Sequence, residues 1–459
     1  MGRLFGTNGV RGVFNKDLTL DLALRLSYAI GEYFKVRNGS RIVLGYDGRY
    51  SSPLLADVVS AGLNAMGIDV YNTSLVPTPC LQYYVKRLNY DGGIMITASH
   101  NPPEYNGIKV IASDGVEIPR EDEVIIEDIF FSERYRLSDR LGNEYSINDA
   151  VDTYIDGIKS LIDIDAIRSK GFSIVVDLGN GAQAVAIPKL LKELGCKVTM
   201  INEHVDGSFP GRGSEPTVDN LNELVSKVRD VGADLGVAYD GDGDRSIFCD
   251  STGTIYAGDR SGAILIEHIL KNEIGNVKVV TPVNSSILID MVVSKHNSSV
   301  HRVKVGSVEV SRAMLKIGAL IGLEENGGFM YARHIAVRDG AMTTALMLEA
   351  LVSSKKGLHE LNSMYKRFYQ YKTKFYYKGT ASIVIEELSK DAMSKGKRVD
   401  TIDGVKVWID DDTWVMVRAS GTEPIMRLYA ESADENKLKD VVTLYNEKVN
   451  AILARYARM

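Results

Sequence analysis

A strand, turn and helix pattern recurs along the chain and constrains its fold more than any other feature. Each copy is a short apolar strand, a turn rich in Gly, Asp, Asn or Ser, and an amphipathic helix, which is typical of βα units in a largely parallel sheet. The strand and turn segments are residues 41–48, 173–180 and 277–284. Pro282 limits how far the third strand can run. The pattern therefore predicts an α/β protein.

The helix after the first strand carries end signals in the sequence. Ser52 is placed to cap it, Pro53 suits its first turn, and Gly67 can end it. Its predicted apolar face consists of Leu54, Leu55, Val58, Val59 and Leu63.

The length of 459 residues is too great for a single core and predicts several domains. The last ninety residues or so differ from the rest, because strand-like runs at 405–409, 414–418 and 425–429 precede a helix at about 435–455. We predict three related α/β domains with mixed sheets plus a smaller C-terminal α+β domain. The predicted ranges are residues 1–150, 151–253, 254–368 and 369–459. The polar, tyrosine-rich stretch 366–378 is the predicted hinge before the last domain.

Charge and cysteine content narrow the class of protein. A net charge of −6 argues against a general nucleic-acid or anionic-membrane surface, although a local basic pocket for phosphate stays open. The three cysteines, Cys80, Cys196 and Cys249, are far apart and odd in number, so we interpret them as buried thiols in a reducing compartment. The N-terminus lacks an apolar signal core, and no stretch approaches membrane-spanning length. We expect a cytoplasmic protein.

An acidic loop, the metal loop, is the most specific local motif. It consists of Asp240-Gly241-Asp242-Gly243-Asp244-Arg245, between apolar runs at 235–238 and 246–249. Three carboxylates in five residues repel one another unless a cation joins them, the glycines let all three point at one ion, and hard oxygen ligands suit Mg²⁺. An EF-hand is excluded because Arg245 stands where Gly is needed and Ser251 where Glu is needed. We predict a magnesium site here, with a solvated acidic turn as the alternative.

A second motif, the serine loop, contains a candidate nucleophile. It consists of Thr97-Ala98-Ser99-His100-Asn101-Pro102-Pro103 and follows the apolar run 94–96. A serine just after a buried strand, with prolines stiffening the chain beyond it, is expected to be fixed and exposed, which favours a covalent role. A serine-hydrolase elbow would need Gly-x-Ser-x-Gly, which is absent, and a structural turn is the alternative. Lys109, ten residues on, would by itself indicate only a solvated surface charge.

A third motif, the phosphate loop, lies in the C-terminal domain. It consists of Arg418-Ala419-Ser420-Gly421-Thr422-Glu423-Pro424. A guanidinium, two hydroxyls and free backbone amides are the groups that bind a phosphate dianion. An ordinary hairpin loop is the alternative.

A fourth motif, the sugar loop, is the weakest when taken alone. It consists of Gly322-Leu323-Glu324-Glu325-Asn326-Gly327-Gly328, and Arg338-Asp339-Gly340 follows it. Carboxylate and amide groups in a glycine-rich loop can hydrogen-bond to sugar hydroxyls. A loop without function is the alternative.

Together and in this order, the four motifs resemble the α-D-phosphohexomutase superfamily, which contains the phosphoglucomutases, phosphomannomutases and phosphoglucosamine mutases. The resemblance covers essentially the whole chain. The opening Phe5-Gly6-Thr7-Asn8-Gly9-Val10-Arg11-Gly12 is similar to the N-terminal loop of the family and closest to its glucosamine branch.

The resemblance implies an enzyme that interconverts hexose 1-phosphate and hexose 6-phosphate through a phosphoserine and a 1,6-bisphosphate. Mg²⁺ is the implied cofactor, a sugar 1,6-bisphosphate the implied activator, and hexose phosphates the implied partners, with no nucleic acid or membrane. The sugar is glucosamine, mannose or glucose, and the sequence does not choose among them. It also leaves the oligomeric state open, with a homodimer among the options.

The resemblance assigns roles to residues of this chain. Ser99 carries the phosphoryl group and holds Mg²⁺ together with Asp240, Asp242 and Asp244. Lys109 serves in acid-base work, Arg11 orients the phosphoryl group, and Arg245 neutralises charge beside the metal. The residues that bind substrate are the sugar-loop Glu324 and Asn326 and, for the phosphate that does not react, Arg418, Ser420, Gly421 and Thr422.

Two positions depart from the family pattern and leave any secondary acid or base undecided. Gly328 stands where several bacterial relatives have histidine, and Ser307 stands where some have another. His334 is close enough in sequence to substitute, but a solvent-exposed loop histidine is an equal interpretation.

Two other classes of protein remain as alternatives. A metal-dependent phosphatase would form phosphoserine and lose it to water, so its product would be orthophosphate. A non-catalytic sugar-phosphate binder is the other, but it would not need Ser99, Lys109 and three aspartates together.

Overall fold

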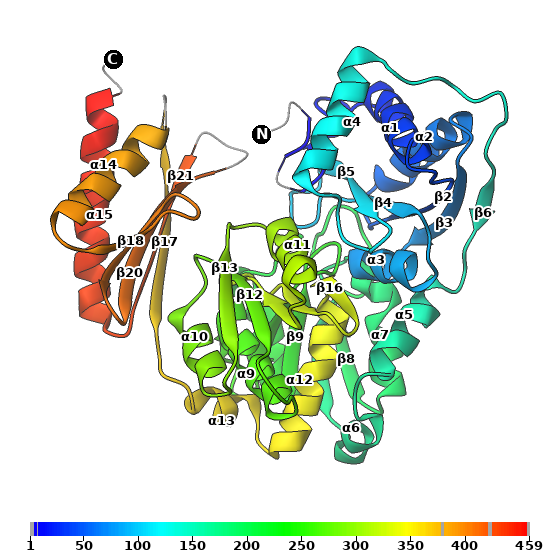
Figure 1. The fold of residues 1–459 in the computed structure, drawn as a ribbon. Coiled ribbons are helices and arrows are strands. Elements are labelled where there is room, and N and C mark those ends of the chain that lie inside the picture. Colours follow the sequence, from blue (N-terminus) through cyan, green and yellow to red (C-terminus); the bar gives the residue numbers. More distant parts are fainter. Residues whose placement is uncertain (1–3, 7, 378–380, 421–424, 457–459) are drawn as a thin grey trace.

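The computed structural model describes residues 4–6, 8–377, 381–420 and 425–456. It confirms the predicted fold class: three α/β domains with mixed sheets stand beside a smaller C-terminal α+β domain (Figure 1). The limits between the domains stay a prediction.

The first domain contains a six-stranded sheet of order β1-β5-β4-β2-β3-β6. Strands β4, β2, β3 and β6 are parallel, and β5 is antiparallel to both of its neighbours. Helices α1, α2 and α4 lie together on one side of the sheet, while α3 faces the middle of the molecule (Figure 1). The elements are β1 (Val10–Val13), α1 (Leu20–Lys35), β2 (Arg41–Tyr46), α2 (Ser52–Ala65), β3 (Asp69–Leu75), α3 (Thr78–Arg87), β4 (Gly92–Ile96), β5 (Tyr105–Ala112), α4 (Arg120–Ser132) and β6 (Glu144–Ser146).

Helix α2 differs from its prediction at the N-terminus. Ser51 occupies the capping position, and Ser52 instead donates a hydrogen bond to Asp47 Oδ1 at 2.6 Å, so the predicted cap is wrong. Asp47, which follows β2, thus takes the Ser52 hydroxyl that was expected to cap α2. Leu54 is 46% exposed and lies outside the apolar face, whereas Leu55 is buried as predicted.

The second and third domains each contain a five-stranded sheet with a parallel and an antiparallel part, of orders β11-β10-β9-β7-β8 and β13-β12-β14-β15-β16. The second has α5 (Ala150–Lys159), α6 (Ile164–Lys170), β7 (Ser173–Asp177), the 3₁₀ turns Ala182–Val185 and Val218–Asn220, α7 (Ile187–Glu193), β8 (Lys197–Ile201), α8 (Asn222–Val231), β9 (Leu235–Tyr239), β10 (Ser246–Asp250) and β11 (Ile255–Tyr256). The third has α9 (Gly258–Lys271), β12 (Lys278–Pro282), α10 (Ile287–Ser294), β13 (Ser299–Val303), α11 (Ser307–Ile317), β14 (Ile321–Leu323), β15 (Phe329–Tyr331), β16 (Ile335–Arg338), α12 (Gly340–Ser354) and α13 (Leu358–Ser363).

The fourth domain has an antiparallel sheet of order β17-β21-β20-β19-β18, with α14 and α15 on one side (Figure 1). The elements are β17 (Tyr369–Tyr376), α14 (Ala381–Ser394), β18 (Arg398–Asp400), β19 (Val405–Asp410), β20 (Thr413–Ala419), β21 (Ile425–Ser432) and α15 (Glu435–Tyr456), which confirms the three predicted strands and the last helix. The predicted hinge at 366–378 is wrong for 369–376, because this tyrosine-rich stretch pairs along its whole length with β21. Tyr369 and Phe375 turn their rings to the core of this domain.

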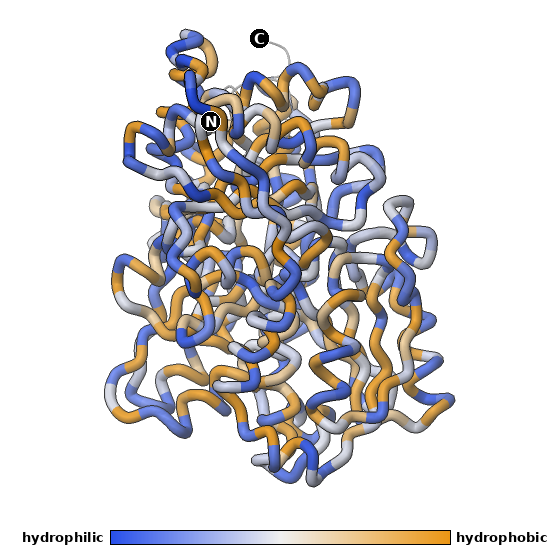
Figure 2. Tube along the Cα trace, turned by 90° about the vertical axis from the view of Figure 1, so that its right-hand side faces the viewer, coloured by the Kyte–Doolittle hydropathy of each residue, from blue (hydrophilic) through white to orange (hydrophobic). Residues whose placement is uncertain are grey.

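The distribution of apolar side chains separates the fourth domain from the others. One core cluster runs from the first through the second into the third domain, whereas the fourth has a core of its own. A small cluster joins it to the third domain: Val283, Ile287, Trp414, Met416 and Tyr429. Figure 2 shows hydrophobic and hydrophilic stretches alternating along the described trace, as expected for helices and strands that each bury one face.

The cysteines lie mostly where the sequence predicts them, inside the protein. All three cysteines are free; Cys80 and Cys249 are buried as predicted, while Cys196 is half-buried. Among the described residues, no helix combines the length and hydropathy needed to cross a membrane.

Candidate active site

Ser99 lies just beyond the carboxyl end of β4, in a backbone conformation that few residues adopt. Its φ is +51°, in the left-handed region, and its side chain is completely buried. The expected exposure is therefore wrong, because the metal loop of the second domain covers the serine. Ser99 Oγ donates a hydrogen bond to Asp240 Oδ2 at 3.0 Å.

A buried arginine holds the serine loop in place. Arg49 donates to the carbonyl oxygens of Ser99 and Asn101, each at 2.7 Å, and of Pro102 at 2.6 Å. Its own guanidinium is fixed by Asp47, which accepts a hydrogen bond from Arg49 Nε at 3.1 Å. Arg49 is a site residue that none of the four motifs predicts. Its position could have indicated a role, because Asp47 and Arg49 directly follow β2. The carboxyl end of β2 lies beside that of β4, which leads into the serine loop.

The metal loop brings its three carboxylates together between β9 and β10, as predicted. Asp240, Asp242 and Asp244 are buried, and one oxygen of each lies within 4.8 Å of the others. Asp242 Oδ1 and Asp244 Oδ1 have no hydrogen-bond partner among the described residues. Buried carboxylate oxygens without donors suit a hard cation, so the donor set fits Mg²⁺.

The electrostatics of these carboxylates also fit a cation. Burial raises the pKa of Asp240 well above its usual range, and the charges of Asp244 and Asp242 raise it further. Burial likewise raises the pKa of Asp244, in spite of the nearby Arg338. For Asp242 burial acts in the same direction, but Lys109, Thr78 and Arg338 together outweigh it and hold the pKa well below its usual range. The cations of the protein therefore do not offset the cost of burying Asp240 and Asp244 as anions, a cost that a bound metal ion would lower.

Three cations of the predicted site surround Ser99 and the metal loop. Lys109, on β5, is buried and donates to Asp242 Oδ2 at 2.9 Å, so it is not a surface charge. Arg11, on β1, donates to Asn101 Oδ1 at 2.9 Å. Arg245 donates to Glu215 Oε1 at 3.0 Å.

His100 of the serine loop is a neighbour of this cluster for which the sequence predicts no role. Its Nδ1 lies 3.0 Å from Arg245 Nη2 and 3.3 Å from Ser99 Oγ. The charge of Arg245, together with burial, holds the pKa of His100 well below its usual range, so the ring is neutral at pH 7. A neutral ring can accept a hydrogen bond from either neighbour.

The sugar loop joins β14 to β15 and faces the metal loop. Glu324 is buried, which raises its pKa, and its Oε2 accepts a hydrogen bond from Arg338 Nη1 at 3.1 Å. Asn326 is half-buried, and its Oδ1 accepts from Gly328 N at 3.2 Å. The two predicted sugar contacts therefore lie on one short loop.

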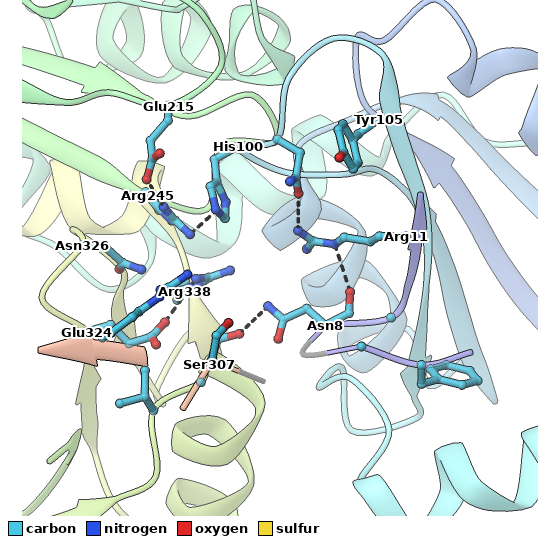
Figure 3. A pocket seen from close by; sticks show the side chains of 18 of the residues that line it. Asn8, Arg11, His100, Tyr105, Glu215, Arg245, Ser307, Glu324, Asn326 and Arg338 are labelled. Carbon is cyan, nitrogen blue, oxygen red and sulfur yellow. Dashed lines mark hydrogen bonds and ion pairs between the residues drawn. The ribbon is translucent and has the colours of Figure 1, made fainter. Parts of the chain in front are cut away.

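A pocket of about 700 Å³ lies where the four domains meet. Asn8, Arg11 and Tyr105 stand on one side of it and Arg245, Glu324, Asn326, Arg338 and Ser307 on the other (Figure 3). Arg418 and Ser420 of the phosphate loop line it as well, while Gly421 and Thr422 lie outside the described residues. Ser99, Lys109 and the three aspartates are buried and lie outside the lining. A cationic pocket of this size suits a sugar phosphate.

Four family models match the chain in succession. They describe phosphoglucomutase/phosphomannomutase alpha/beta/alpha domains I, II and III, at residues 2–137, 152–253 and 257–368, and the C-terminal domain, at residues 380–445. The chain belongs to the α-D-phosphohexomutase superfamily.

Individual relatives span nearly the whole phosphohexomutase chain. A phosphoglucosamine/phosphogalactosamine mutase of Sulfurisphaera tokodaii is 45% identical, over 96% of this chain and 98% of the relative. A phosphoglucomutase/phosphomannomutase of Thermococcus kodakarensis is 41% identical, over 97% and 98%. Among solved structures, a phosphoglucomutase/phosphomannomutase family protein of Burkholderia thailandensis superposes with a TM-score of 0.89 at 26% identity, covering 98% of this chain and 97% of that one.

The structure gives His334 and Ser307 defined places in this phosphohexomutase. His334 is buried, with Nδ1 3.0 Å from Asp339 Oδ2 and its ring stacked on Tyr83, so it is neither a pocket residue nor a solvent-exposed one. Ser307 lies in the pocket wall, where its Oγ accepts a hydrogen bond from Asn8 at 2.9 Å. No ionisable side chain stands at either position 307 or 328.

Proposed function

We propose that this phosphohexomutase interconverts hexose 1-phosphate and hexose 6-phosphate by carrying the phosphoryl group on Ser99 and passing through a hexose 1,6-bisphosphate. The observation that carries this proposal is the hydrogen bond from Ser99 Oγ to Asp240, which places the hydroxyl in the metal loop beside Lys109. Phosphoryl transfer depends mainly on positioning and on positive charge around the phosphoryl oxygens, which this cluster supplies.

We assign the metal position to Asp240, Asp242 and Asp244, with an oxygen of phospho-Ser99 completing the site. Mg²⁺ bound there would neutralise negative charge on the phosphoryl group as it transfers. The unpartnered oxygens of Asp242 and Asp244 support this assignment.

The chain's own residues account for the rest of the reaction. As the sugar hydroxyl forms its bond to phosphorus, the bond to Ser99 Oγ breaks; the hydroxyl loses a proton and Oγ gains one. Lys109 is the group we assign to this proton exchange, while Arg11 orients the phosphoryl group and Arg245 neutralises charge beside the metal position. The bisphosphate then turns round, and its other phosphoryl group returns to Ser99.

Two further parts of the substrate, the sugar ring and the phosphate that does not react, are bound by other residues. Glu324 and Asn326 form hydrogen bonds with the sugar hydroxyls. The phosphate that does not react is bound by the phosphate-loop residues Arg418, Ser420, Gly421 and Thr422. A sugar 1,6-bisphosphate would prime a dephosphorylated Ser99 as activator.

The sugar itself is proposed as glucosamine, mannose or glucose. The two relatives named above act on different sugars at similar identity to this chain, which supports a relaxed specificity. A cytoplasmic location and a homodimer stay predictions.

A mutase assay tests the proposal. Purified protein with Mg²⁺ and glucose 1,6-bisphosphate is given glucosamine, mannose and glucose 1-phosphates in turn, and the 6-phosphate and orthophosphate are both measured. We expect 6-phosphate from at least one sugar, little orthophosphate, and loss of turnover on chelation with EDTA. Ser99→Ala should abolish turnover, whereas Ser132→Ala, at the end of α4, should leave it unchanged. Orthophosphate as the main product, or an active Ser99→Ala variant, would overturn the mechanism.

A further inference from the structure

Arg338 links two loops that the proposed reaction must keep in register. It ends β16, lies in the pocket wall beside Glu324 and Asn326 (Figure 3), and is 5% exposed. One nitrogen of its guanidinium donates to Glu324 in the sugar loop, and the other donates to Asp244 in the metal loop. A planar fork with two separate donors is the geometry that can bridge two carboxylates.

Gly328 makes room for this arginine. A Cβ atom at position 328 would lie 2.3 Å from Arg338 Cδ and 2.8 Å from Cγ, far inside contact distance. The backbone of Gly328 lies outside the left-handed region, so space, and not conformation, requires glycine here. Because the guanidinium is held at both nitrogens, the aliphatic part of Arg338 has little freedom to move aside.

The backbone that carries Arg338 is fixed from the other side. Asp339 caps α12 by accepting a hydrogen bond from Met342 N at 2.9 Å, and it also contacts Tyr154 and His334. Asp339 is 1% exposed, and Tyr154 belongs to the second domain. The buried cluster around Asp339 therefore anchors the position from which Arg338 reaches the pocket.

We propose that Arg338 is a positioning residue that sets the sugar loop against the metal loop. The inference rests on the proposed function, in which Glu324 holds the sugar and Asp244 belongs to the metal site. By bridging the two carboxylates, Arg338 fixes the distance from the sugar hydroxyl to the phosphoryl group. A misplacement of about 1 Å in such geometry can cost about 100-fold in rate. An arginine does not lose its proton in a protein, so its role is geometric and electrostatic.

The first experiment separates positioning from binding. Arg338→Met should lower kcat by about 100-fold and leave KM within about threefold, because the sugar and phosphate contacts remain while their alignment is lost. Arg338→Lys, with one donor group for two carboxylates, should lower kcat by about tenfold. Arg333→Met, an exposed arginine five residues earlier that pairs with Glu273, is the matched control and should change neither. An unchanged kcat in Arg338→Lys, or a loss expressed only in KM, overturns the proposal.

A double-mutant cycle tests the link between the arginine and the glycine. Gly328→Ala should lower kcat as Arg338→Lys does, and should add nothing in the Arg338→Met background, since the side chain it displaces is already gone. Gly357→Ala, where the nearest neighbour of an added Cβ is 3.6 Å away, is the control. Additive losses in the double variant overturn the link.

Calorimetry gives a readout that does not depend on turnover. Hexose 6-phosphate is titrated into the wild-type protein and the variants in EDTA, and we expect dissociation constants within about threefold of each other; a tenfold weakening in Arg338→Lys overturns the positioning role. If Arg338→Met does not fold, Arg338→Lys and Gly328→Ala decide the matter. Wild-type protein that binds the sugar phosphate but does not isomerise it would contradict the proposed function instead.

Discussion

Ser99 holds a backbone conformation that costs free energy, and its neighbours hold it there. A non-glycine residue in the left-handed region is disfavoured by about 1 kcal/mol or more. Ser99 N donates to Thr97 Oγ1 at 2.8 Å, and Ser99 O accepts from Arg49. In the turn so fixed, Ser99 Oγ donates its hydrogen bond to Asp240.

Lys109 is the residue at which the charge of the site can be tested most directly. Lys109→Met removes the ammonium that pairs with Asp242, and we expect kcat to fall by about 100-fold or more, because both the proton exchange and the positive charge are lost. The measurement is kcat at saturating Mg²⁺ and substrate. Lys109→Arg keeps the charge but exchanges protons poorly, so it should remain slow while folding normally. A fast Lys109→Arg variant would remove Lys109 from the proton exchange.

Among the helices and strands, the sequence predicted those features that follow from a local pattern of residues. It did not predict the features that depend on contacts between distant segments. The apolar runs that became β2, β4, β7 and β9, and the motifs at their ends, were placed correctly. The strand β17 was missed because it lies at the edge of its sheet and alternates aromatic with polar residues, without the buried aliphatic run that marks the central strands. Arg49 looks like any loop arginine until the serine loop folds over it, and the burial of His334 depends on Tyr83 from another domain.

A buried carboxylate at the start of α9, that of Asp259, destabilises the folded protein when it is ionised. Asp259 is buried where α9 meets the fourth domain; its Oδ2 accepts from Ser286 N at 2.9 Å and Gln370 Nε2 at 3.2 Å. Burial, with the charges of Glu325 and Glu431, raises the pKa of Asp259 to about 6. In the unfolded chain this carboxyl group loses its proton near pH 4. Its ionisation therefore lowers the free energy of unfolding between about pH 4 and about pH 6, with no loss below this range and the full loss above it.

Asp259→Asn should therefore stabilise the protein in a pH-dependent way. Above about pH 6 the neutral amide removes a cost of about 3 kcal/mol, whereas below about pH 4 the variant and the wild type should unfold alike. Unfolding midpoints are compared at pH 4 and pH 8 without substrate. Asp139→Asn changes a fully exposed carboxylate and serves as the control. A gain in stability that is equal at both pH values would show that the charge of Asp259 is not its cause.

For the whole molecule, the separate core of the fourth domain bears on how the pocket works. The phosphate loop belongs to that domain, while the metal loop and sugar loop belong to the second and third, which share a continuous core with the first. Asp403 of the fourth domain bridges this division, because its Oδ2 accepts from Arg418 Nε at 2.8 Å and from Val305 N of the third domain at 3.0 Å. Asp403 thus joins the arginine to the pocket wall of the third domain.

We expect a bound hexose phosphate to draw the fourth domain towards the other three through Arg418. Small-angle scattering of the wild-type protein should show a smaller radius of gyration with hexose 6-phosphate than without it. Arg418→Met removes a charged phosphate contact, so the change should disappear and KM should rise by about 10- to 100-fold. Arg398→Met, in the same domain but stacked on Trp408 outside the pocket, should behave as the wild type. If the Arg418→Met protein still contracts, the closing contact lies elsewhere in the phosphate loop; if the wild type does not contract, the bisphosphate turns round in a pocket that keeps its open shape.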